Sequence, residues 1–204
     1  MKIGIIGPIA SGKSTLAHIL SKHFDLPLVE ETVEKNDFLP LFYKEKATFA
    51  LFSQNNFYGS LFYNLYQMKG SKGYVSDTTV YSNLVFSHLM VDEGILTQEE
   101  LSSIKVLGQK HIEVLGECDI YIVIKRSKQD LFLNWRSRNR LIEKDQEDYL
   151  DFHYSNYYLK LDQILKVYQV DPKKIYTIEN VDFMNRFELD LLLKDFRQFK
   201  ERLS

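Results

Sequence analysis

The feature that most constrains this chain is a glycine-rich pattern close to its start. Gly7-Pro8-Ile9-Ala10-Ser11-Gly12-Lys13-Ser14 matches G-x-x-x-x-G-K-[ST]; it follows an apolar run at 2–7 and precedes a helical pattern that reaches about His23. In the order strand, loop, helix, backbone N–H groups of the loop converge on phosphate oxygens, and the helix N-terminus adds partial positive charge. The pattern therefore predicts a nucleoside triphosphate site in a parallel α/β sheet.

Individual positions of this loop carry different parts of the expected chemistry. Lys13 would reach the transferring phosphates, and Ser14 could ligate Mg²⁺. A tight strand-to-helix turn that contains Gly and Lys by chance is the alternative, but spacing, residue identity and flanking elements all favour the nucleotide site. The residues expected to bind the phosphate donor here are Gly7, Ile9, Ala10, Ser11, Gly12, Lys13, Ser14 and Thr15.

The rest of the chain alternates further strands with helices. Candidate strands lie at 26–30, 73–77, 118–125 and 174–178, and long helical stretches lie at about 34–70, 80–116, 128–168 and 183–202. Such alternation implies crossover connections. We therefore expect a P-loop NTPase fold, with a five-stranded parallel sheet flanked by helices on both faces. Without a repeat, a linker or a shift in composition, residues 1–204 are predicted to form one domain.

Composition excludes several classes of protein. The net charge of -2 argues against non-specific nucleic-acid binding, which needs a large basic face. The only cysteine, Cys118, cannot form an intrachain disulfide or build a cysteine-based zinc site. No apolar run approaches the roughly 18 residues that would span a bilayer. The sequence is thus typical of a soluble cytoplasmic protein that binds neither nucleic acid nor membrane.

Two polar features suggest an acceptor pocket. Glu30-Glu31 ends the second strand, at the sheet edge where ligands bind in open α/β folds, and a carboxylate there could take a hydroxyl proton or could simply be solvated. Gln54 lies on an otherwise apolar helical face that includes Ala50, Phe57, Leu61 and Leu65. Its amide could read the edge of a nucleobase or could bond to neighbouring backbone.

A basic segment follows the fourth strand. Residues 125–144 hold seven basic and two acidic side chains, among them Arg136, Arg138 and Arg140. In a helix Arg136 and Arg140 can share one face, and guanidinium groups suit bidentate contacts with phosphate. The segment is either a solvated helix end or a mobile cationic lid, over about 134–146, that closes over the phosphates. The phosphate loop favours the lid.

Together these pieces resemble the deoxynucleoside kinase family, from residue 1 to about 185. Glu31-Thr32-Val33 is similar to that family's Glu-Pro-Val, and 36–43 is similar to its Asn-x-x-Leu-x-x-Phe-Tyr. The resemblance implies that Glu31 is the base for the 5′-hydroxyl, and that Gln54 reads the nucleobase. It also implies that Tyr43 and Glu143 hold the 3′-hydroxyl.

The same resemblance implies a phosphoryl-transfer mechanism with ATP as donor and Mg²⁺ as cofactor. Lys13, Arg138 and Arg140 would act on the transferring phosphoryl group together with the base, Arg136 and Arg140 would contact the donor, and Ser14 and Asp77 would organise the metal. Asp182-Phe183 resembles the family's Asp-Phe near the adenine of the donor. The expected acceptor is a small molecule, a purine deoxynucleoside used in nucleotide salvage, and the expected assembly is a homodimer.

One departure from the family pattern leaves alternative functions open. The third strand ends in Asp77-Thr78-Thr79, where the family has Asp or Glu followed by Arg-Ser. Threonine supplies neither charge nor a forked donor. The alternatives to a deoxynucleoside kinase are therefore another small phosphate-loop kinase, acting on a nucleoside monophosphate or a different hydroxyl, and a nucleotide-binding subunit with weakened catalysis.

Overall fold

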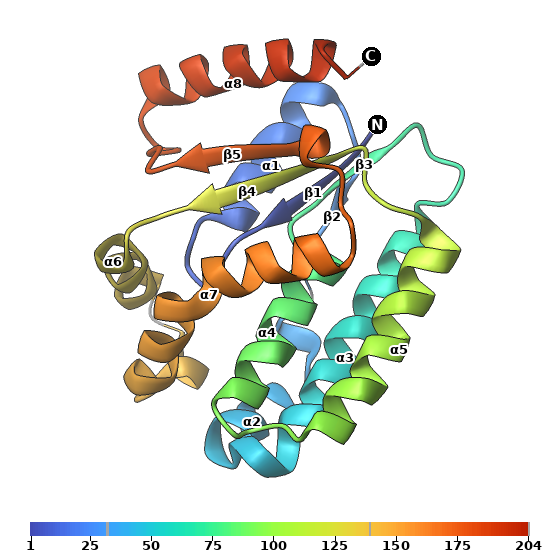
Figure 1. The fold of residues 1–204 in the computed structure, drawn as a ribbon. Coiled ribbons are helices and arrows are strands. Elements are labelled where there is room, and N and C mark those ends of the chain that lie inside the picture. Colours follow the sequence, from blue (N-terminus) through green and yellow to red (C-terminus); the bar gives the residue numbers. More distant parts are fainter. Residues whose placement is uncertain (32, 139, 204) are drawn as a thin grey trace.

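A computed structural model describes residues 1–31, 33–138 and 140–203, and Figure 1 shows how its elements are arranged. The strands are β1 Lys2–Ile6, β2 Leu28–Val29, β3 Tyr74–Ser76, β4 Ile120–Lys125 and β5 Ile175–Glu179. The α-helices are α1 Lys13–Phe24, α2 Leu39–Lys44, α3 Lys46–Gln67, α4 Val80–Asp92, α5 Gln98–Leu115, α6 Lys128–Arg138, α7 Glu147–Val167 and α8 Arg186–Glu201. Short 3₁₀ turns are η1 Val33–Lys35, η2 Leu141–Glu143 and η3 Pro172–Lys174.

The strands form one five-stranded sheet in the order β2-β3-β1-β4-β5, and every pair is parallel. This confirms the predicted P-loop fold. The central strand β1 pairs with both neighbours, with Ile3 opposite Val75 on one side and Ile120 on the other. Because β1 is buried on both faces after Lys2, its residues 3–6 are apolar without interruption rather than alternating.

Helices cover both faces of the sheet, as predicted. Ile3 and Ile5 of β1 pack in one apolar cluster with Leu16 of α1 and Phe196 of α8, and Ile6 faces the other cluster, which contains α3, α4, α5 and α7. In Figure 1, α8 lies above the sheet and α7 and α4 lie below it. Since successive side chains of a strand point to opposite faces, β1 serves both layers at once.

Three of the predicted long helical stretches are each divided into shorter helices. The stretch 80–116 is two helices, because Gly94 takes a positive φ of 76° and Thr97 starts α5 with a capping box to Glu100. The stretch 34–70 divides into η1, α2 and α3, and 128–168 divides into α6, η2 and α7. The predicted strand at 26–30 is also shorter, since only Leu28–Val29 pairs with β3.

Throughout the described residues, every helix is too short or too polar to cross a bilayer.

Candidate active site

A cavity of about 450 Å³ opens at the carboxyl ends of the strands. Such an edge is where ligands bind in open α/β sheets. The predicted site residues that line it are Ile9, Ala10, Ser11, Gly12, Lys13, Ser14, Thr15, Glu31, Tyr43, Gln54, Asp77, Arg138, Arg140, Glu143, Asp182 and Phe183. The structure thus brings together residues as distant in the sequence as Ile9 and Phe183, and of the predicted set it leaves out only Gly7 and Arg136.

The phosphate loop curls as its glycines require. Gly12 has a φ of 96°, and a side chain at Gly7 would approach Ser11 Oγ to 2.6 Å. Lys13 Nζ donates to the carbonyl oxygens of Gly7 and Pro8, at 2.9 and 3.0 Å, so the ammonium group lies folded over its own loop. Burial lowers the pKa of Lys13. Gly7 therefore acts through the shape of the loop rather than from the cavity wall.

Asp77 connects three parts of the site. It follows β3, and its Oδ2 accepts a hydrogen bond from the Ser14 hydroxyl at 2.9 Å. Its Oδ1 accepts from the backbone N–H of Glu31 at 2.6 Å. Burial raises the pKa of Asp77, and these two hydrogen bonds act in the opposite direction. One carboxylate thereby fixes the start of α1 relative to the end of β2.

The two neighbouring glutamates at the end of β2 have different surroundings. Glu30 is exposed, and its Oε1 lies 3.4 Å from His18 Nε2. Glu31 lines the cavity, where burial raises the pKa of its carboxyl group while Lys13 acts to lower it. The residues alone left the choice between them open, whereas the structure turns only Glu31 toward the phosphate loop.

The other end of the cavity is apolar, with an amide in its wall. Gln54 is 4% exposed, and its Oε1 accepts a hydrogen bond from the Ser87 hydroxyl at 3.1 Å. Apolar and aromatic side chains line the cavity around it: Leu39, Phe42, Phe57, Phe86, Met90 and Tyr149. Tyr43 is also buried here, and burial with the nearby Glu143 raises its pKa. The surroundings fit a flat, largely apolar ligand with a polar edge.

The aromatic residues of 38–66 are not all core. Phe42, Tyr43 and Tyr58 are buried, but Phe52 and Tyr63 are 52% and 64% exposed on the outer side of α3. Only part of this set therefore packs inside, because α3 contacts the rest of the protein along one face.

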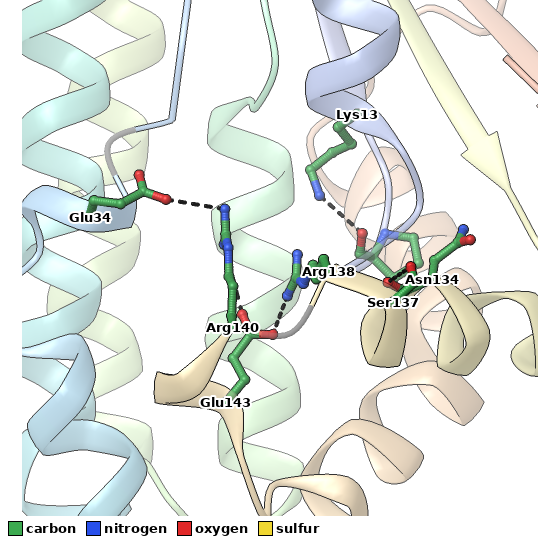
Figure 2. A network of polar contacts seen from close by, with 8 residues as sticks. Lys13, Glu34, Asn134, Ser137, Arg138, Arg140 and Glu143 are labelled. Atoms are coloured by element: carbon green, nitrogen blue, oxygen red, sulfur yellow. Dashed lines mark hydrogen bonds and ion pairs between the residues drawn. The ribbon is translucent and has the colours of Figure 1, made fainter. Parts of the chain in front are cut away.

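Figure 2 shows the basic segment at the mouth of the cavity. Arg138 forms an ion pair with Glu143, which is buried. Arg140 lies between Glu34, at 3.3 Å, and Glu143, at 3.8 Å. Two guanidinium groups thus compensate one buried carboxylate, and Arg140 reaches across to η1.

Arg136 differs from the other two arginines. It is exposed and pairs with Glu147 of α7 at 2.6 Å, so the structure does not bring it to the cavity. Arg140 lies beyond the end of α6 at Arg138, so it does not share a helical face with Arg136. Asn139, within the same predicted segment, lies outside the described residues.

Two residues that the sequence did not predict hold the phosphate loop from outside. Arg126 Nε donates to the carbonyl of Ser11 at 2.9 Å, and its guanidinium stacks on Phe183 at 5.0 Å. Asn134 Nδ2 donates to the carbonyl of Ala10 at 3.1 Å. Arg126 comes directly after β4, so its position at the carboxyl edge of the sheet could have been used to predict a role in the site. No feature of the sequence around Asn134 indicates its contact with the loop.

Thr78, at the position where the resemblance to the family leads us to expect arginine, is buried. Its hydroxyl acts to lower the pKa of Glu31, but no described residue lies in hydrogen-bonding geometry with it. Beside it lies a space of about 10 Å³, lined in part by Glu31 and Asn83. Thr32, the other departure from the family pattern, lies outside the described residues.

The site offers few protein ligands for Mg²⁺. Within 1–31, 33–138 and 140–203, no group of three or more His, Cys, Asp or Glu side chains could hold a metal ion. Ser14 and Asp77 nevertheless bring two hard oxygen atoms to within 2.9 Å at the phosphate loop. Mg²⁺ favours such sites, since it is commonly bound by one or two protein groups with phosphates and water. The donor set therefore fits Mg²⁺ shared with a nucleotide.

The model of the deoxynucleoside kinase family matches residues 3–193. The chain belongs to this family. Among curated relatives, a deoxyguanosine kinase of Lactobacillus acidophilus is 28% identical over 90% of this chain and 83% of its own length. A deoxyadenosine kinase of Dictyostelium discoideum is 28% identical over 90% of this chain and 82% of its own.

Solved structures of deoxynucleoside kinases have the same fold. Deoxyadenosine kinase from M. mycoides with bound dATP superposes with a TM-score of 0.80 at 22% identity, over 97% of this chain and 100% of that one. Its complex with dCTP gives the same TM-score at 19% identity, with the same coverage. The family membership makes the chain a phosphotransferase that acts on a hydroxyl group of a deoxynucleoside.

Proposed function

We propose that this deoxynucleoside kinase transfers the γ-phosphoryl group of ATP to the 5′-hydroxyl of a purine deoxynucleoside. The observation that carries the proposal is that the phosphate loop, the carboxyl group of Glu31 and the amide of Gln54 all line one cavity. A phosphoryl donor and an apolar acceptor with a polar edge can therefore be bound together, which converts the transfer into a step within one complex.

The acceptor side supplies a base and two sets of contacts. Glu31 accepts the proton of the 5′-hydroxyl, and its raised pKa suits a proton acceptor near neutral pH. Tyr43 and Glu143, both at the cavity wall, hold the 3′-hydroxyl. Gln54 reads the edge of the base, while Phe57 and Phe86 supply apolar and aromatic surface around it.

The donor side supplies positive charge. Lys13, Arg138 and Arg140 stabilise the charge on the transferring phosphoryl group, and the backbone N–H groups of the loop bind phosphate oxygens. Asp182 and Phe183 lie against the adenine. Ser14 and Asp77 are the residues that would hold Mg²⁺, which neutralises charge on the phosphates when bound.

Three further properties belong to this proposal. The deoxyguanosine and deoxyadenosine kinases among the relatives support a purine acceptor. The proposal also assigns the enzyme to nucleotide salvage in the cytoplasm. The chain acts as one domain in which 134–146 is the lid. It forms a homodimer, for which exposed apolar side chains on α3 and α5 provide surface: Phe52, Tyr63, Tyr66, Val106 and Leu107.

Product analysis tests the proposal. The protein is incubated with ATP, Mg²⁺ and, one at a time, each natural nucleoside, deoxynucleoside and nucleoside monophosphate, and the products are identified by chromatography. We expect a deoxynucleoside 5′-monophosphate from deoxyadenosine or deoxyguanosine. Formation of a diphosphate from a monophosphate would instead identify a nucleoside monophosphate kinase. ATP binding without turnover of any acceptor would identify a weakened subunit, and the buried Thr78 would then be the first residue to examine.

A further inference from the structure

A serine behind the cavity wall is hydrogen-bonded to the amide of Gln54. Ser87 lies on α4, is fully buried and does not line the cavity. Its hydroxyl oxygen is 3.1 Å from Gln54 Oε1 and 2.9 Å from the backbone carbonyl oxygen of Asn83. A hydroxyl group has one proton and two acceptor lone pairs, so it can donate fully to only one of these oxygens at a time.

Two arrangements of these groups satisfy the amide. In the first, the Ser87 hydroxyl donates to Gln54 Oε1. In the second, the amide is rotated by 180°, its nitrogen donates to Ser87 Oγ, and the hydroxyl donates to the carbonyl of Asn83. The two ends of an amide differ only in hydrogen-bonding character, and its orientation follows from its partners. Since Ser87 can act as donor or acceptor, it supports either orientation.

Nothing else in the described part of the chain fixes the amide. The Ser87 hydroxyl is the only hydrogen-bond partner of the Gln54 side chain among the described residues. The Tyr58 hydroxyl also lies near Ser87, which acts to lower its pKa, and it has no hydrogen-bond partner within the described ranges. Tyr58 could donate to Ser87 Oγ in both arrangements, because one lone pair remains for it in each. It therefore does not favour one orientation.

The orientation of the amide decides which base it can pair with. On its Watson–Crick edge, a 6-aminopurine presents an amino donor beside a ring-nitrogen acceptor, whereas a 6-oxopurine presents a carbonyl acceptor beside an N–H donor. The two patterns are reversed, and rotating an amide reverses its own pattern in the same way. We propose that Ser87 lets Gln54 turn to match either edge, so that the kinase accepts both 6-amino- and 6-oxopurine deoxynucleosides. This inference rests on the proposed function.

Deoxyadenosine and deoxyinosine test it, because their bases differ only in these two groups. Binding of each is measured by calorimetry with a non-hydrolysable ATP analogue and Mg²⁺, and phosphorylation is measured separately as kcat and KM. For the unchanged protein we expect dissociation constants within about tenfold of each other. An amide fixed in one orientation would leave two groups unpaired against one of the bases, and we expect that to separate the constants by more than about 100-fold.

Ser87→Ala removes the partner of both orientations. We expect it to raise the dissociation constant and KM of both nucleosides by about two- to tenfold, with kcat unchanged. Ser82→Ala is the matched control, because Ser82 is equally buried on α4 but its hydroxyl contacts Thr79 rather than Gln54. It should leave both dissociation constants unchanged, even where it lowers the melting temperature.

The inference would be overturned by a preference above about 100-fold in the unchanged protein, by a Ser87→Ala effect confined to one nucleoside, or by no effect of Ser87→Ala on either. Absence of binding for both nucleosides would overturn it as well. Comparable binding of both without phosphorylation would leave the inference standing and refute the proposed function, so the two failures are distinguishable.

Discussion

Replacement of Glu31 by glutamine separates the two contributions that this residue makes to the site. Its backbone N–H donates to Asp77 at 2.6 Å, and its carboxyl group lines the cavity near Lys13. Glu31→Gln keeps the shape of the side chain and the backbone hydrogen bond. It removes only the group that accepts a proton, so the geometry of Asp77 and the phosphate loop should persist.

The expected loss follows from the role of a positioned base. General-base catalysis contributes about 10²- to 10⁴-fold, which is roughly 3–5 kcal/mol of activation free energy. We therefore expect kcat of Glu31→Gln to fall by that factor. The dissociation constant for ATP should change by less than about threefold, because the hydrogen bonds between Ser14, Asp77 and the backbone of residue 31 remain.

The pH dependence gives an independent check. Burial raises the pKa of Glu31 above 4.5, and the group accepts a proton only when ionised. Activity of the unchanged protein should therefore fall as the pH falls through this raised pKa, and Glu31→Gln should lose that limb. Because the pKa of Glu31 is higher in the folded than in the unfolded protein, ionising this group lowers the free energy of unfolding. This loss is complete at a pH above the folded-state pKa and absent at a pH below the unfolded-state pKa. Glu31→Gln should thus raise the melting temperature at neutral pH but not in acid.

Initial rates of nucleoside phosphorylation between about pH 4.5 and 8 measure these effects, with ATP binding followed by calorimetry. Glu30→Gln is the matched control, since Glu30 is adjacent in sequence but exposed and paired with His18. It should keep its rate and its pH profile. Normal turnover in Glu31→Gln, or an equal loss in Glu30→Gln, would refute the reasoning.

Four further substitutions test the fold and the site. Gly12→Ala places a side chain at a φ of 96° and 3.1 Å from the Phe183 ring, so we expect weaker ATP binding and a loss of about 1–3 kcal/mol of stability in urea denaturation. Leu84→Ala, in the fully buried face of α4, should lower the free energy of unfolding by about 2–5 kcal/mol in the same assay. Thr97→Ala removes the cap of α5; thermal denaturation should show a loss of about 1 kcal/mol, with unchanged activity. Thr78→Arg introduces a guanidinium beside only about 10 Å³ of free space. We therefore expect the free energy of unfolding in urea to fall by about 1–3 kcal/mol, with no gain in kcat. A large gain in kcat would show that the pocket readily accommodates arginine.

Some features of the fold could be predicted from the sequence, and others could not. The strand at 118–125 and the parallel sheet follow from uninterrupted apolar runs between helical patterns. The division of 80–116 into two helices was also readable, because Gly94 and Thr97 are local stop and start signals. The strand order was not readable, since it depends on which crossover packs on which face of the sheet.

The sequence by itself determined the phosphate loop, because its residues are contiguous and their spacing alone sets the backbone shape that binds phosphate. Only the tertiary structure decided the remainder of the site. It turned Glu31 rather than Glu30 inward, kept Arg136 with Glu147 outside the cavity, and placed Ser87 behind Gln54. These outcomes depend on contacts between elements that are distant in the chain, and the local pattern of residues contains no record of which side chains packing will bring within hydrogen-bonding distance.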